Sequence, residues 1–244
     1  MKIHQILHGY QDGHGRLAGS VQDITPQDAA LMSQMSDWSG YRDPAGKDNS
    51  YITAYPLLES GYYVVAKSWY ASEMERPGCV WTHSLLIDLN DIESQFDFRL
   101  LEKIYQRPVR GDYGLYNKSI ELDVEQKFEK GWDGSKVDDV SLMFMLSTLV
   151  NGEENFFLKV EQESLWNQRL CLTFLQFLPT GMLRRITMSS GCGSPRRMLN
   201  ELLSMQFVSN NDGLSLVSPP WSGQLEENDF SAGLKFVTFA MKEK

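Results

Sequence analysis

Three consecutive segments decide the fold of this chain: residues 51–57 (YITAYPL), 62–70 (YYVVAKSWY) and 80–89 (VWTHSLLIDL). Each is rich in β-branched and aromatic residues, a composition that favours β-strands. Residues 59–61 (ESG) form a turn sequence between the first two segments, so the pattern predicts a hairpin followed by a third strand. We therefore expect an antiparallel meander at the centre of the N-terminal half.

Further elements are expected on both sides of this meander. Residues 3–10 form a short apolar run that ends in the turn sequence of residues 11–13 (QDG). Thr25 is followed by proline, which predicts a helix that continues to about Met35, because threonine is a good N-cap and proline fits the first helical position. Residues 98–105 have the pattern of a second helix.

The C-terminal half alternates between helical and strand patterns, which indicates a small α/β unit. Ser194-Pro195 repeats the signal of an N-cap followed by proline and predicts a helix there. The fold class is thus α+β, with an antiparallel sheet in the N-terminal half and a mixed helix/strand unit in the C-terminal half. The expected elements are helices at 137–149, 164–177 and 194–205, strands at 156–160, 183–189 and 214–217, and a helix or strand at 231–241.

A glycine-rich stretch with scattered aromatic residues, 107–136, separates the two halves and predicts a seam. The domain organisation expected from it is a sheet-rich part over 1–106, the irregular seam over 107–136, and a helix-rich α/β part over 137–244. The alternative is one compact domain overall, which the length of 244 residues also permits.

The composition disfavours several classes of function. A net charge of −9 and a pI of about 5.0 argue against direct nucleic-acid binding and against docking on anionic membranes, both of which need a basic surface. The sequence has no secretory leader pattern and no stretch of 18 apolar residues, which predicts a cytoplasmic protein. The three cysteines, Cys79, Cys171 and Cys192, include no CxxC pair, so we expect reduced thiols and no zinc site or other cofactor.

A group of histidines offers the strongest candidate for enzymatic chemistry. His8, Asp12 and His14 lie within seven residues, and imidazole and carboxylate groups are the ligands of zinc and iron sites. A metal-dependent hydrolase would also use His83, if the first strand runs beside the third strand of the meander. The spacing matches no established ligand motif, so we expect no metal and no catalytic residues, and keep the hydrolase as the alternative.

Charged residues in two places are candidates for binding a partner protein. One 14-residue stretch of this acidic chain contains four arginines, Arg184, Arg185, Arg196 and Arg197. Guanidinium groups recognise phosphate or carboxylate surfaces. The same function is expected of Glu73 and Arg76, which lie on a long loop between two aromatic-rich strands. Trp81 is the second residue of the later strand and is expected to anchor the loop in the core.

Several of these segments together resemble a known family. They are residues 7–14 (LHGYQDGH), 36–40 (SDWSG), 55–57 (YPL), 69–83 (WYASEMERPGCVWTH) and, more loosely, 175–189 (LQFLPTGMLRRITMS). This pattern resembles the N-terminal domain of the bacterial GTPase-associated protein 1 family.

The resemblance implies a non-enzymatic adaptor of a GTPase-linked anti-phage conflict system, often the first part of a longer protein. The partner would be a GTPase or another protein of such a system. The third interpretation, beside the adaptor and the hydrolase, is a structural subunit of a homo-oligomeric defence assembly. The resemblance assigns no roles to the shared positions His8, Asp12, His14, Trp81 and His83.

Overall fold

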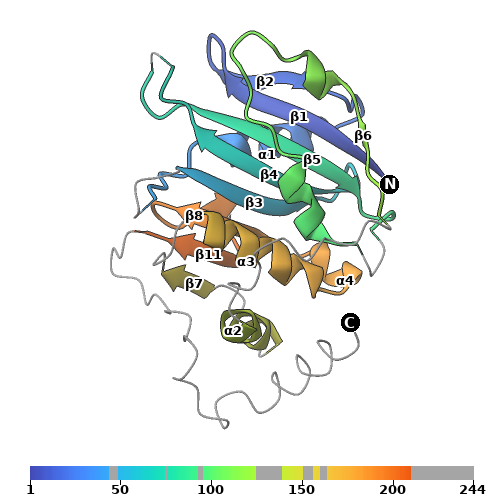
Figure 1. Cartoon of the computed structure of the whole chain (residues 1–244), viewed down its shortest axis with the longest axis vertical. Coiled ribbons are helices and arrows are strands. Elements are labelled where there is room, and N and C mark those ends of the chain that lie inside the picture. Colours follow the sequence, from blue (N-terminus) through green and yellow to red (C-terminus); the bar gives the residue numbers. More distant parts are fainter. Residues whose placement is uncertain are drawn as a thin grey trace.

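A single mixed β-sheet forms the centre of the molecule (Figure 1). The computed structural model describes residues 1–43, 49–74, 76–92, 96–124, 139–150, 156–159 and 164–209. The sheet has nine strands in the order β2-β1-β5-β4-β3-β8-β11-β7, with β6 paired to β1 beside this path. It therefore joins strands from both halves of the sequence.

The elements of the N-terminal half follow one another closely. They are β1 (Lys2–Tyr10), β2 (His14–Gly19), α1 (Pro26–Ser36), β3 (Ser50–Leu57), β4 (Tyr62–Tyr70), β5 (Val80–Asp88), the 3-10 helices η1 (Phe98–Lys103) and η2 (Gly114–Asn117), and β6 (Ile120–Glu121). The expected hairpin and third strand are confirmed: β3 pairs with β4, and β4 with β5, both antiparallel and over their whole lengths. β1 adds to the other side of β5, also antiparallel.

The helix predicted from Thr25 is confirmed as α1 and covers one face of the sheet. The Thr25 hydroxyl accepts a hydrogen bond from the Asp28 amide at 3.2 Å, and the Asp28 carboxylate accepts one from the Ser60 amide at 2.7 Å. The first bond satisfies a free amide of the first turn, and the second ties the helix to the β3–β4 turn. Leu31, Met32 and Met35 then pack on the apolar side chains of this face.

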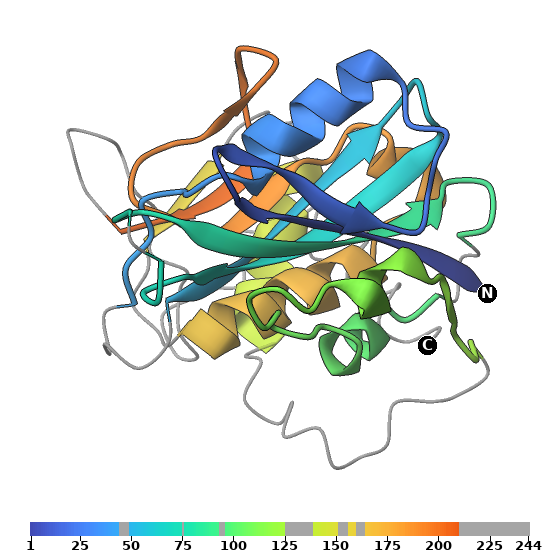
Figure 2. The ribbon, with the colours of Figure 1, turned by 90° about the horizontal axis from the view of Figure 1, so that it is seen from above.

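The opposite face carries the larger core (Figure 2). There, α3 (Ser164–Gln176) and η1 pack on inward side chains such as Tyr63, Val65 and Leu85. Residues 98–105, expected as a helix, form the shorter 3-10 helix η1, whose Asp97 N-cap accepts from the Arg99 amide.

The C-terminal half contributes the parallel part of the sheet. Its elements are α2 (Asp139–Val150), β7 (Phe156–Lys159), α3, α4 (Thr180–Leu183), β8 (Met188–Cys192), β9 (Arg197–Met198), β10 (Glu201–Leu202) and β11 (Met205–Val208). β11 lies between β7 and β8 and is parallel to both. β8 also pairs antiparallel with β3. The α+β class, with an antiparallel N-terminal sheet and a mixed C-terminal unit, is therefore confirmed.

Two elements of the C-terminal half differ from expectation. The strand expected at 183–189 starts only at Met188, because α4 extends to Leu183 and a turn follows it. The helix expected at 194–205 is wrong: the segment forms the β9–β10 hairpin and leads into β11. Its local helix signal is overridden by tertiary contacts, since the buried Gln206 side chain bonds both the amide and the carbonyl of Arg196.

Some expectations fall outside the described residues. The strand at 214–217 and the element at 231–241 belong to this group, as do residues 125–136 of the expected seam. Residues 107–124 of the seam are described and run past the outer strands, where Gln5 donates to the Lys118 carbonyl at 2.6 Å. None of the helices in the described ranges is long and apolar enough to cross a membrane.

Gly193→Ala should destabilise the junction between the two halves. A Cβ at Gly193 would lie 2.5 Å from the Gly40 carbonyl oxygen, which is backbone and cannot move aside easily. We expect the free energy of unfolding in urea to fall by about 1–3 kcal/mol, as for other overpacked sites. Gly181→Ala is the matched control, because a Cβ there meets nothing within 4 Å; equal losses in both variants would contradict the steric argument.

Candidate functional site

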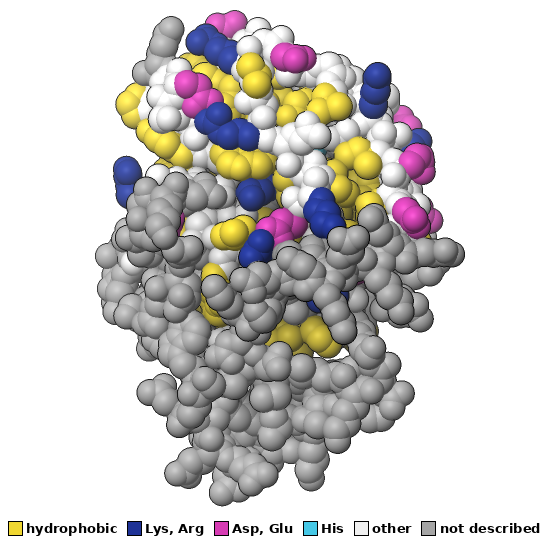
Figure 3. Space-filling model, viewed as in Figure 1, with side chains coloured by type: hydrophobic (Ala, Val, Ile, Leu, Met, Phe, Trp, Pro, Cys, Tyr) yellow, Lys and Arg dark blue, Asp and Glu magenta, His cyan; other side chains and the backbone are white. Residues whose placement is uncertain are grey.

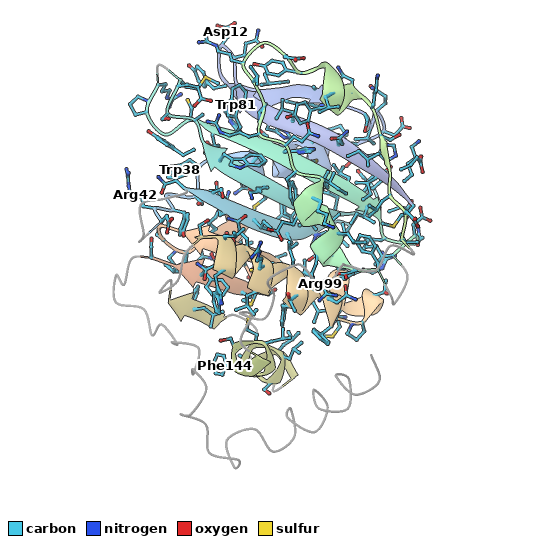
Figure 4. The ribbon with its side chains drawn as sticks, viewed as in Figure 1. Asp12, Trp38, Arg42, Trp81, Arg99 and Phe144 are labelled. Carbon is cyan, nitrogen blue, oxygen red and sulfur yellow. The ribbon has the colours of Figure 1, made fainter. Side chains whose placement is uncertain are left out.

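Segments that lie far apart in the sequence meet at one end of the strands. These are residues 10–14, 37–43, 70–74, 76–79 and 191–195, and we call the surface they form the motif end. Figure 4 labels Asp12, Trp38, Arg42 and Trp81 along it. Most of the family-like segments quoted above contribute to this end, which makes it the candidate functional site.

The Trp38-Ser39-Gly40 segment is docked through backbone contacts against the end of β8. The Gly193 amide donates to the Ser39 carbonyl at 2.9 Å, and the Ser39 hydroxyl donates to the Gly191 carbonyl at 3.0 Å. Gly40 has a φ of +74°, a backbone conformation that favours glycine. Small residues on both sides let the two backbones touch, so a side chain at Gly40 or Gly193 would separate them.

A cluster of aromatic side chains packs around Trp38 of this segment. The ring of Trp38 lies 5.4 Å from that of Tyr70 and 6.0 Å from that of Tyr51. The buried Tyr51 hydroxyl donates to the Asp37 carbonyl at 3.2 Å and accepts from the Ser39 amide at 3.1 Å. Trp38 itself is half-buried, so part of its ring faces outward from a fixed position.

The loop between β4 and β5 is fastened by Glu73. Its carboxylate accepts from the Trp81 indole at 2.8 Å and from the Arg107 guanidinium, also at 2.8 Å. Partial burial opposes ionisation, but the bonds from Arg107 and Trp81 outweigh it and lower the pKa of Glu73. Trp81 is fully buried, as expected of an anchor. Glu73, expected to contact a partner, thus has internal partners that hold the loop in place.

Arg76 lies differently on the same loop. Its guanidinium carbon is 5.7 Å from the centre of the Tyr10 ring, a cation–π contact, and its side chain is exposed. Within the described parts of the chain no carboxylate forms an ion pair with it. Arg76 is therefore a positioned cation that can meet a carboxylate or phosphate of another molecule.

The histidines do not gather into one centre. His8 and His14 stack with ring centres 6.2 Å apart, and His14 also bonds the Ser36 hydroxyl at 2.8 Å. His83 pairs with Leu7 across the β1–β5 ladder, so it lies on the face opposite to His8. The site that joins His83 to His8, which the hydrolase interpretation needs, is therefore not formed. Among the described residues, no three His, Cys, Asp or Glu side chains are placed to hold a metal ion.

Asp12 and His83 instead occupy positions that the fold itself explains. Asp12 occupies the turn between β1 and β2 with a φ of +57°, a conformation that aspartate tolerates. The His83 ring bonds the Gln5 side chain at 2.9 Å and accepts from the Gln106 amide at 3.3 Å. Because Gln106 donates to Nδ1, the proton is on Nε2 and points to the Gln5 oxygen.

The four arginines expected to bind a partner differ in their surroundings. Arg196 reaches the end of α1, where its guanidinium donates to the carbonyls of Gln34, Met35 and Asp37 and to the Thr53 hydroxyl. This helix has no basic residue in its own last turn, so Arg196 supplies the positive charge favoured there. Arg184, Arg185 and Arg197 remain exposed.

Cys192 is the last residue of β8 and is buried. Burial raises the pKa of its thiol, and the sulfur donates to Gln206 at 3.5 Å. The helix that was expected to start after it is absent, so no helix N-terminus activates the thiol. Sequence reasoning did not identify Gln206 or Arg107, since a single polar residue carries no periodic signal of its contacts, and it marked Ser39 only as part of the segment 36–40.

Lowering the pH should destabilise the protein through His8 and His83. Burial, and for His8 also His14 and Arg16, lowers the pKa of each to about 3. The unfolded chain binds protons from about pH 6.5 downward, so stability is full above pH 6.5 and is lost as the pH falls toward 3. We expect the free energy of unfolding to drop by up to about 4 kcal/mol between pH 7 and pH 5. In His83→Gln this drop should be about half as large, and an equal drop would contradict the assignment.

Arg196→Gln should destabilise the fold by about 1–3 kcal/mol in urea unfolding at pH 7, because the carbonyls at the end of α1 lose a charged donor. Arg197→Gln is the matched control, since among the described residues that exposed side chain bonds only the Asn200 carbonyl of its own turn. We expect a change of less than about 0.5 kcal/mol in the control. Equal effects would mean that Arg196 does not hold the helix end.

Comparison with known proteins agrees with the motifs that lie within residues 2–105, whereas the family-like segment 175–189 lies outside the match. Residues 2–105 match the family model of the GTPase-associated protein 1, N-terminal domain type 1. Neither the curated proteins nor the solved structures give a significant match. The family expected from the sequence is thus confirmed over residues 2–105, which resemble the type 1 N-terminal domain of GTPase-associated protein 1.

Proposed function

We propose that this chain is a non-enzymatic interaction module that binds a GTPase, or another protein of a GTPase-linked anti-phage conflict system, through the motif end. The observation that carries the proposal is the convergence of the family-like segments on one surface. The family name supports an association with a GTPase, while the adaptor role and the defence context rest on the resemblance described above.

The construction of the motif end favours binding over local chemistry. Its backbone is fixed by the contacts of Ser39 with β8 and by the hydrogen bonds of Glu73, so little conformational entropy is lost when a partner docks. Trp38 and Arg76 present a ring and a guanidinium, the groups enriched in the energetic centres of interfaces. On the face of the molecule that Figure 3 shows, hydrophobic side chains are mixed with Lys, Arg, Asp and Glu over the described part.

A nucleotide-dependent pull-down tests the proposal. The purified chain would be used to retain proteins from the native host in the presence of GDP or of a non-hydrolysable GTP analogue. Recovery of a GTPase that depends on the added nucleotide supports the adaptor function. Recovery of the chain alone contradicts it and favours the homo-oligomeric subunit, which a sedimentation experiment at micromolar concentration would show directly.

Arg76→Glu should weaken binding of the recovered GTPase about tenfold or more, because it replaces the positioned cation with a like charge toward an acidic partner. The thermal midpoint should stay within about 1 °C of the wild type, since the side chain is exposed. Lys118→Glu makes the same charge change at an exposed site toward the opposite end of β1 and should leave the affinity unchanged. Equal affinity for wild type and Arg76→Glu would remove Arg76 from the interface.

A further inference from the structure

The fold engages two of the four arginines in the part of the chain that matches the family model. The matched residues 2–105 contain Arg16, Arg42, Arg76 and Arg99. Arg16 donates to the Val21 carbonyl at 2.6 Å, and Arg99 forms an ion pair with Asp97 at 2.7 Å. Arg42 and Arg76 are exposed, and within the described ranges no carboxylate pairs with either of them. Both of these guanidinium groups belong to the motif end.

An aromatic ring orients the guanidinium of Arg76 but not that of Arg42. The Tyr10 ring lies 5.7 Å from the Arg76 guanidinium carbon, and Arg42 has no such ring contact in the described part of the chain. A cation–π contact at an exposed site stabilises by only about 0.5–1 kcal/mol. It therefore restricts the position of Arg76 without preventing a stronger anionic ligand from binding the same group.

The backbone on both sides of Arg76 is restricted as well. Pro77 follows it and disfavours the helical conformation for Arg76, and Gly78 has a φ of +84°, which suits glycine. At the base of the loop, the Ala71 amide donates to the Cys79 carbonyl at 2.9 Å. Figure 1 shows the loop extending past the ends of β4 and β5. Arg76 is therefore presented from a fixed base at the margin of the molecule.

A guanidinium presented in this way has the chemistry to assist GTP hydrolysis. In that reaction the oxygen of water bonds to the γ-phosphorus, while the bond from this phosphorus to the β–γ bridging oxygen breaks. The electron pair of the broken bond stays on GDP, and the water oxygen and its two protons end on dihydrogen phosphate. An arginine that a second protein supplies stabilises the charge of the transition state and accelerates hydrolysis by about 10³–10⁵-fold. The planar, weakly hydrated guanidinium suits this function better than an ammonium group does.

We propose that Arg76 enters the nucleotide site of the partner GTPase as an arginine finger, so that docking of the motif end accelerates GTP hydrolysis. The nucleotide, its magnesium ion and the attacking water belong to the partner, and this chain adds one cation to the transition state. The identity of the partner rests on the proposed function above, to which the inference adds an activity. Arg76 and its loop lie within the residues that match the family model.

The first measurement is single-turnover hydrolysis by the GTPase recovered in the pull-down, purified and loaded with GTP. A saturating concentration of the wild-type chain should accelerate hydrolysis about 100-fold or more. Arg76→Ala and Arg76→Lys should each lose most of this acceleration, and the lysine variant shows that the guanidinium is needed and not the charge alone. Arg42→Lys, the matched control at the same end of the strands, should accelerate hydrolysis as the wild type does.

The second measurement is affinity for the GTPase loaded with GDP, with and without aluminium fluoride, which mimics the phosphoryl group in transfer. The wild-type chain should bind the aluminium fluoride state about tenfold or more tightly than the GDP state, because Arg76 bonds a group that only the former contains. In Arg76→Lys this difference should disappear, while its affinity for the GDP state stays within about threefold of the wild type. A difference that persists in Arg76→Lys would contradict the inference.

Failure of the inference is distinguishable from failure of the proposed function. A GTPase that binds the wild-type chain without faster hydrolysis overturns the inference and leaves the proposed function intact. Acceleration that survives in both Arg76 variants, or that is lost in Arg42→Lys instead, overturns the assignment to Arg76. A pull-down that retains no GTPase refutes the proposed function itself, and the inference with it, before any hydrolysis is measured.

Discussion

The close approach of two backbones, at Gly40 and Gly193, is the constraint on which the rest of the structure depends. It brings the loop after α1 onto the end of β8, and so connects the antiparallel meander with the parallel strands of the C-terminal half. The contact leaves no room for a side chain, because a Cβ on Gly193 would overlap the Gly40 carbonyl group. The Ser39 hydrogen bonds, the Trp38 position and the path of the chain into the hairpin all follow from it.

Buried polar side chains hold the junctions that apolar packing alone would leave free to slide. Gln206 fixes the hairpin, Arg196 fixes the end of α1, and Gln168 on α3 bonds the Ser50 hydroxyl at 2.9 Å where β3 begins. Such groups are stabilising only when their partners are in place, because an unpaired polar group in the core is costly. They therefore specify one arrangement of helices on the sheet rather than simply adding to its stability.

The sequence predicted the elements whose signals are local. The strands β3, β4 and β5 follow from their β-branched and aromatic composition, and α1 from the cap at Thr25. The failure at Ser194-Pro195 has a clear cause: the same cap signal was present, but Gln206, several residues later, takes both backbone groups of Arg196. Local propensity cannot anticipate such a contact.

The candidate site was predictable only in part, for the same reason. The loop with Glu73 and Arg76 was found from its composition, and the family-like motifs marked the segments that meet. Their convergence depends on the register of β1, β5 and β8, as does the separation of His83 from His8. A shift of one residue would exchange the faces on which these histidines lie, so no spacing rule could have decided the question.

The position of β8 in the sheet has a kinetic consequence. The meander is built from neighbouring segments, whereas β3 meets β8 through contacts such as that between Ile52 and Ser190, 138 residues apart in the sequence. Contacts between distant segments form late, since the long intervening chain must first be closed. During synthesis the β3 edge is therefore complete but unpaired until its distant neighbour emerges, and an open strand edge is prone to pair with other chains. The protein is thus vulnerable to aggregation during an interval of its synthesis. The duration of this interval is set by the time needed to translate the C-terminal half of the chain.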